Sequence, residues 1–108
     1  MSSNLDDINE ILRLINDSDN RVLEIIKFTK EQIKEFFKYV IFYQEKKEEN
    51  YRKLADEISG DIIIQLLRAV NILENRKDQN AIKTKDSIIK ITGIIMNVRK
   101  SIGLNPQK

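Results

Sequence analysis

Acid–base and metal chemistry in this chain would have to rest on carboxylates and lysines. The 108 residues include no His and no Cys, which removes the commonest metal ligand, the commonest general base and every thiol nucleophile. The nearest match to a metal-binding pattern is DSDNRVLEIIKF, which from Asp17 has acids at the first and third positions of a calcium loop. Val22 stands where that loop needs Gly, and Phe28 stands where it needs a bidentate Glu. We therefore expect no metal site and no cofactor.

A second group of acids lies in the stretch KKEENYRKLADE. Carboxylates on the helices of a bundle can hold two metal ions, but such a site also needs Glu-x-x-His pairs, and this chain has no His. A charged face in contact with solvent is the simpler explanation. Because the sequence offers neither a nucleophile with a base nor a set of metal ligands, we expect a protein that is not an enzyme.

Basic side chains gather in the last third of the chain. Residues 1–75 hold 11 Lys/Arg against 15 Asp/Glu, whereas residues 76–108 hold 8 against 2. In one interpretation, an acidic N-terminal helix lies beside the basic C-terminal one and the charges compensate. In the other, the basic third binds nucleic acid, without aromatic side chains to stack on single strands. The basic set includes Arg76 and Arg99, and the candidate nucleic-acid contacts are Lys83, Lys85, Lys90 and Lys100.

Aromatic side chains gather elsewhere. All four Phe and all three Tyr lie between Phe28 and Tyr51, most of them in KEFFKYVIFYQ. On a helical wheel this segment is apolar nearly all round, because Phe36, Val40 and Tyr43 share one side and other apolar residues flank both edges. Such a helix needs cover on more than one side. The flanking residues are our candidates for a partner interface: Phe37, Tyr39, Ile41 and Phe42.

Three blocks of heptad-spaced apolar residues predict the helices that carry these groups. The first block runs from Leu5 to Leu54 without a change of phase, although polar residues stand in it at Asp19, Lys47 and Asn50. The phase is lost in ISGD and again in NRKDQN, which are therefore predicted turns. The second block is Ser59, Ile63, Leu66, Val70 and Leu73, and the third is Ala81, Thr84, Ile88, Ile91, Ile95, Val98 and Ile102.

A third turn is predicted in NDSDN, because short polar side chains compete for backbone hydrogen bonds and cap helices well. The expected helices then span residues 5–16, 19–57, 61–75 and 81–102. Gly93 lies inside the last of them, where glycine costs about 1 kcal/mol relative to alanine, so we expect close helix packing there. That helix should end where Gly103 can take a left-handed conformation, Leu104 can pack back and Pro106 cannot continue the helix.

The sequence thus predicts an all-α fold, an elongated antiparallel helical bundle of three to four helices with coiled-coil-like heptad packing, in a single domain over residues 1–108. The first three or four residues, which are short and polar, and residues 104–108 are expected to be flexible. A helix over 19–57 would be about 58 Å long, too long for the other helices to cover. We therefore expect a homodimer or larger assembly. The alternative is a monomer whose long helix breaks near residues 47–50.

These features predict a non-catalytic helical protein–protein interaction or adaptor protein that self-associates through its aromatic-rich helix. The alternative is a small regulatory protein that binds nucleic acid through its basic C-terminal third. The start MSSNLDDINE is acidic and polar, unlike a signal peptide, and no apolar run is long enough for a transmembrane segment. We expect a soluble, cytoplasmic protein with a protein partner.

Overall fold

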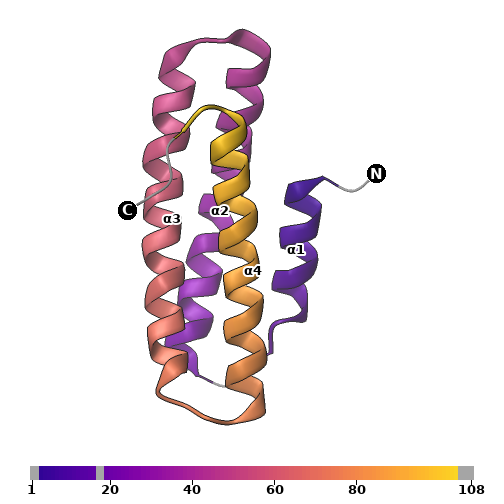
Figure 1. The fold of residues 1–108 in the computed structure, drawn as a ribbon, viewed down its shortest axis with the longest axis vertical. Coiled ribbons are helices and arrows are strands. Elements are labelled where there is room, and N and C mark those ends of the chain that lie inside the picture. Colours follow the sequence, from indigo (N-terminus) through magenta and orange to yellow (C-terminus); the bar gives the residue numbers. More distant parts are fainter. Residues whose placement is uncertain (1–2, 17–18, 105–108) are drawn as a thin grey trace.

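The structure is a computed structural model that describes residues 3–16 and 19–104. Within these ranges it has no strand and four helices: α1 (Asn4–Leu14), α2 (Asn20–Lys46), α3 (Glu49–Glu74) and α4 (Gln79–Ser101). The helices run alternately down and up (Figure 1), and each contacts the next, with α4 returning to α1. The molecule measures 46 × 31 × 19 Å. It is an elongated, antiparallel, all-α bundle, which confirms the predicted fold class.

One inward face of each helix forms a shared core. Every position of the third predicted block, from Ala81 to Ile102, is buried. In the second block only Val70 is half-buried and the rest are buried. Each fully buried aliphatic or Phe side chain stabilises the fold by about 1.5–3 kcal/mol. The buried positions of the first block are Ile8, Leu12, Val22, Thr29, Ile33, Phe36 and Val40.

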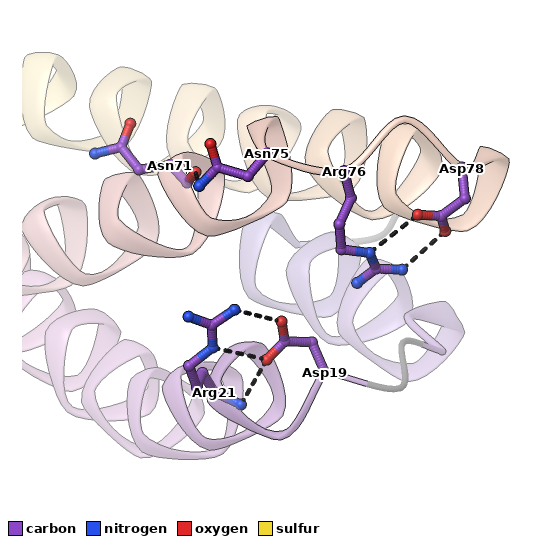
Figure 2. Close-up of polar contacts among 6 residues, drawn as sticks. All are labelled: Asp19, Arg21, Asn71, Asn75, Arg76 and Asp78. Carbon is purple, nitrogen blue, oxygen red and sulfur yellow. Dashed lines mark hydrogen bonds and ion pairs between the residues drawn. The ribbon is translucent and has the colours of Figure 1, made fainter.

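The predicted turn in NDSDN is confirmed, because α1 ends at Leu14 and α2 begins at Asn20. Asp19 is the N-cap of α2. Its Oδ1 accepts the backbone N–H of Arg21 at 2.9 Å, and its Oδ2 lies 2.9 Å from the Arg21 guanidinium (Figure 2). Such a cap satisfies a backbone donor that a helix start leaves unpaired.

The structure contradicts the predicted helix over residues 19–57. α2 ends at Lys46, Lys47 takes a left-handed conformation at φ 57°, and α3 begins at Glu49. The chain folds back here, as in the alternative reading of the polar residues near 47–50. At about 40 Å, α2 fits beside its neighbours, and the radius of gyration of 14.1 Å is close to the ~13 Å expected for a compact chain of this length. Helix length therefore no longer argues for self-association.

The predicted turn at ISGD is wrong, since α3 runs through Gly60 without interruption. The apparent loss of phase came from assigning Leu54 to the first block. Leu54 is exposed, and Ala55 takes the core position instead. From Ala55 the buried positions of α3 continue in one phase through Ser59 and Ile62, so the glycine only lowers helix propensity locally.

The predicted turn in NRKDQN is confirmed. Asp78 caps α4 by accepting the Ala81 N–H at 3.2 Å, and its carboxylate lies 2.8 Å from the Arg76 guanidinium (Figure 2). At the end of α3, the side-chain amide of the C-cap Asn75 donates to the Asn71 carbonyl at 3.4 Å. The Arg76 hydrogen bond holds the pKa of Asp78 below its ordinary value. Two Asp caps, each held by an Arg two residues away, therefore start α2 and α4.

The predicted end of the last helix is also confirmed. Gly103 has a φ of 81°. Its N–H donates to the Lys100 carbonyl at 3.1 Å, and the Leu104 N–H donates to the Arg99 carbonyl at 2.9 Å. These bonds make a Schellman motif, which needs a residue that tolerates positive φ. Leu104 packs against the core, Ser3 caps α1 and Asn4 begins it, whereas the other residues predicted to be flexible, 1–2 and 105–108, lie outside the described ranges. Among the residues described, no helix is long and apolar enough to cross a membrane.

Candidate functional site

The four residues predicted as a partner interface lie on two flanks of α2. Tyr39 and Phe42 lie on one flank, where Phe42 contacts α3. The Phe42 ring packs on Tyr51 with the centroids 5.3 Å apart, and the Tyr39 hydroxyl donates to Glu35 at 3.4 Å. Burial, and then the Glu35 charge, raise the pKa of Tyr39. Both rings are half-buried, so the chain itself supplies much of their cover.

Cationic side chains add cover to the aromatic end of α2. Lys38 and Lys46 lie 6.0 and 5.8 Å from the centroid of the Phe42 ring. Lys47 and Arg52 lie at similar distances, 5.8 and 6.0 Å, from the Tyr43 ring. Such contacts contribute about 0.5–1 kcal/mol each at exposed sites. The aliphatic stems of the Lys and Arg side chains also shield the rings from water. The aromatic cluster is therefore covered by α3 and by its own neighbouring cations.

Phe37 and Ile41 lie on the other flank of α2, beside a groove between α2 and α4. The Phe37 ring is only 8% exposed and meets Phe36 edge to face at 5.3 Å. Ile41 is 48% exposed and also lines the groove. Of the predicted set, the structure therefore brings only Phe37 and Ile41 together around an open space.

This α2–α4 groove has a volume of about 250 Å³. The groove lies where α1 begins. Because α1 has 11 residues and α2 has 27, α1 covers only part of the length of α2 (Figure 1). A capping box fixes that beginning: the Ser3 hydroxyl accepts the Asp6 N–H at 3.1 Å, and the Asp6 carboxylate accepts the Ser3 N–H at 3.4 Å. None of the described residues that line the groove has a charged side chain. Its apolar lining consists of Leu5, Phe37, Val40, Ile41 and Val98.

The lysines predicted as nucleic-acid contacts are spread around α4. Lys83 lines a cavity beside the end of α1, whereas Lys100 lines a depression near the end of α4. Lys85 is half-buried and Lys90 is exposed. On a helical wheel Lys90 and Lys85 lie roughly 140° apart. The four ammonium groups therefore do not form a single basic surface.

Arg76 and Arg99 of the basic set are engaged within the chain. Arg76 is bound to the cap residue Asp78. Arg99 is only 4% exposed, and its Nη1 donates to Asp56 Oδ1 at 2.8 Å and to the Ser59 hydroxyl. α1, which carries three acids and one Arg, also contacts the basic α4. These contacts favour the interpretation in which the charges compensate inside the bundle.

The cluster of Arg99, Asp56 and Ser59 was not identified from the sequence. Its one visible signal was a Ser at a heptad position between apolar residues, because a buried hydroxyl needs a partner. The partner lies 40 residues away along the chain, which spacing alone does not reveal. The cluster joins α3 to α4 and fixes their register.

A second apolar surface lies on the outer face of α4 and reaches the edge of the core at Met96. Ile82 and Ile89 are exposed there and Met96 is half-buried. Gly93 lies between them, and a Cβ atom added to it would meet nothing within 4 Å. The close helix packing predicted at Gly93 is therefore absent within the described chain. A depression of about 330 Å³ lies there instead, lined by Gly93, Met96, Asn97, Lys100 and Leu104.

Among the described residues, no three His, Cys, Asp or Glu side chains gather where they could hold a metal ion. Comparison of the chain with protein-family models, with curated proteins and with solved structures gives no match. The candidate binding surfaces of the described chain are the α2–α4 groove and the outer face of α4.

Proposed function

We propose that this protein is a non-catalytic binding protein that takes apolar side chains from a helix of a partner protein into the α2–α4 groove. The observation that supports this proposal is an open groove with a largely apolar lining, at the edge of which Ile41 is 48% exposed. Exposed apolar surface with polar edges is typical of interaction sites.

The size and lining of the groove favour a protein partner over a small molecule. A volume of about 250 Å³ lies below the 300–1,000 Å³ typical of small-molecule sites. The polar groups around it are the uncharged side chains of Ser3, Asn4, Gln44 and Ser101, which offer no charge to recognise an ionic ligand. An amphipathic helix places apolar side chains three or four residues apart and inserts them into such a groove.

Self-association through the aromatic helix, the mode predicted from the sequence, has less support. That prediction assumed an uncovered α2, whereas α3 packs along α2 and its Tyr51 covers part of Phe42. Ile41 and Phe37 keep their predicted role in binding, now as parts of the groove. Tyr39 and Phe42 act in this proposal by holding α2 against α3.

Site-specific cross-linking in cells of the source organism tests the proposal. A photoreactive amino acid at position 41 should give a covalent adduct with another protein, and the same group at position 14 should not. Leu14 is a matched control, because it is 69% exposed and does not line the groove. Replacing Ser101, an exposed residue of the lining, by Trp should fill the groove and remove the adduct. No adduct at position 41, or the same adducts at both positions, would contradict the proposal.

No described contact favours the second candidate function, nucleic-acid binding through Lys83, Lys85, Lys90 and Lys100. It has a direct test, since each phosphate contact releases a counterion and affinity then falls steeply with salt. We expect the adduct at position 41 to survive nuclease treatment. We also expect no salt-dependent binding of DNA or RNA at physiological ionic strength.

A further inference from the structure

The outer face of α4 carries a heptad of its own, separate from the buried one. Ile82, Ile89 and Met96 recur every seven residues, and a second series falls between them. The combined spacing alternates four and three, which is the pattern of a helix that packs along another helix. The second series is Asp86, Gly93 and Lys100.

This face has a projecting apolar side chain, Ile89, and a depression at Gly93 that could hold such a side chain. Ile89 is 52% exposed and projects from the helix. One turn further on, Gly93 has no side chain and open space above it, at the floor of the depression of about 330 Å³. Glycine in a helix interior lowers helix propensity, and no contact within the described chain compensates. An approaching side chain from outside would use this space.

We propose that a second copy of this chain pairs with the first through the outer face of α4, with the two α4 helices antiparallel. A two-fold axis beside residues 89–93 sets Ile89 of each copy over Gly93 of the other. Because the interface is symmetric, the same contact forms twice: Ile89 of each copy fills the depression at Gly93 of the other. A glycine at a helix crossing lets the opposing side chain and backbone approach closely.

Charge selects the antiparallel direction. In this arrangement Asp86 of each copy lies within one helical turn of Lys100 of the other, so opposite charges meet at both ends. A parallel pair would set Asp86 against Asp86 and Lys100 against Lys100, and like charges across an interface disfavour that register. The aliphatic stem of Lys100 also lies near the partner's Ile82 in the antiparallel pair and can cover it.

Apolar side chains of α3 widen the surface. The Arg99–Asp56 contact at 2.8 Å fixes the register of α3 against α4. Counting about ten residues along both antiparallel helices from that contact places Leu67 at the level of Ile89. Leu67 is 52% exposed. Leu67 therefore lies level with the proposed contact, on the neighbouring helix.

Self-pairing goes beyond the proposed function and uses a different surface. The groove residue Ile41 lies on α2, and none of the residues that line the depression on α4 also lines the groove. Ile41→Asp should therefore leave self-pairing unchanged, and a monomeric protein could still bind a partner in the groove. The two proposals can fail separately.

Sedimentation equilibrium of the full chain, from micromolar to millimolar concentration, tests the pairing. We expect a monomer–dimer equilibrium for the natural sequence. Gly93→Leu fills the depression and should weaken the dimer by roughly tenfold or more, while its thermal melt as a monomer does not fall, because leucine favours helix over glycine. Leu14→Asp, on α1, should leave the dimer unchanged. A natural sequence that stays monomeric throughout, or a Gly93→Leu variant that pairs as tightly, would overturn the inference.

Charge reversal tests the direction of the pair. Asp86→Lys and Lys100→Asp should each weaken the dimer, and the two together should restore it, because the opposite charges again meet across the interface. A purely local effect of either substitution would not be rescued by the other. If the double variant pairs no better than the single ones, the antiparallel arrangement is wrong.

Discussion

The seam between α2 and α4 is closed in one part and open in another. Where α1 covers the seam, its own side chains Ile8 and Leu12 are buried, and α1 contacts both α2 and α4. Beyond the start of α1 the same two helices leave a groove in which Ile41 is half exposed. The side chains are apolar in both parts, so composition does not distinguish them. What differs is the length of the covering helix, which the capping box at Ser3 limits. A short helix in a bundle of long ones thus leaves open the groove that we propose as the binding surface.

The largest effect should come from opening the closed part. Ile8→Ala removes a fully buried side chain and should lower the free energy of unfolding by about 2–5 kcal/mol. Urea denaturation measures this loss. Leu14→Ala, on the same helix but exposed, should stay within about 0.5 kcal/mol of the natural sequence. Equal effects of the two substitutions would mean that α1 does not close the seam.

A smaller effect should come from the boundary between the two parts. Ser3→Ala removes the hydroxyl that accepts the Asp6 N–H, and loss of such a cap costs about 1 kcal/mol. The first turn of α1 should fray, so amide hydrogen exchange should speed up at Asp6 and Asp7 and not at Leu12. Unchanged exchange at the first turn would show that the cap does not set where the groove begins.

The closed end of the seam should respond to acid. The Arg21 hydrogen bond lowers the pKa of Asp19 from 3.8 to about 2. A lowered pKa in the folded state stabilises the fold above the ordinary value, and this contribution is lost as the pH falls through about 2. Asp19→Asn keeps a capping side chain and should flatten the dependence of the melting temperature on pH in that window. Asp78, whose pKa is lowered by Arg76, should supply the dependence that remains.

The smallest effect on stability should come from the open part. Ile41→Asp changes an exposed position, so the free energy of unfolding should shift by about 0.5 kcal/mol or less. The same substitution places a charge among described lining residues that are all uncharged, and the adduct formed at the groove should be lost. A photoreactive group at position 44, which also lines the groove, would report this. A large loss of stability would show that Ile41 belongs to the core.

Heptad spacing predicts the helices and their inward faces because burial follows the period of the helix, as the uniformly buried series from Ala81 to Ile102 shows. It failed at residues 47–48, where the chain reverses in a tight turn and the buried phase moves by one residue, from the expected Leu54 to Ala55. That error made α2 too long and moved the predicted turn to Gly60.

The groove itself could not be predicted, because it depends on where α1 starts relative to Val98 and Val40, which meet only in three dimensions. The same reason hid the pairing of Arg99 with Asp56, whose separation along the chain is 43 residues. Ile41 and Phe37 could be placed on one flank of the helix from the sequence, because position on the wheel is local information.

The most direct test of the account is calorimetric titration of the protein with the helix of the partner captured at position 41. We expect one-to-one binding with a negative heat-capacity change, which marks burial of apolar surface. Ile41→Asp should weaken this binding by roughly thirtyfold or more, as expected for a central apolar contact worth about 2 kcal/mol, and Leu14→Asp should leave it unchanged. If both variants bind as tightly as the natural sequence, or if both lose affinity alike, the α2–α4 groove is not the binding site.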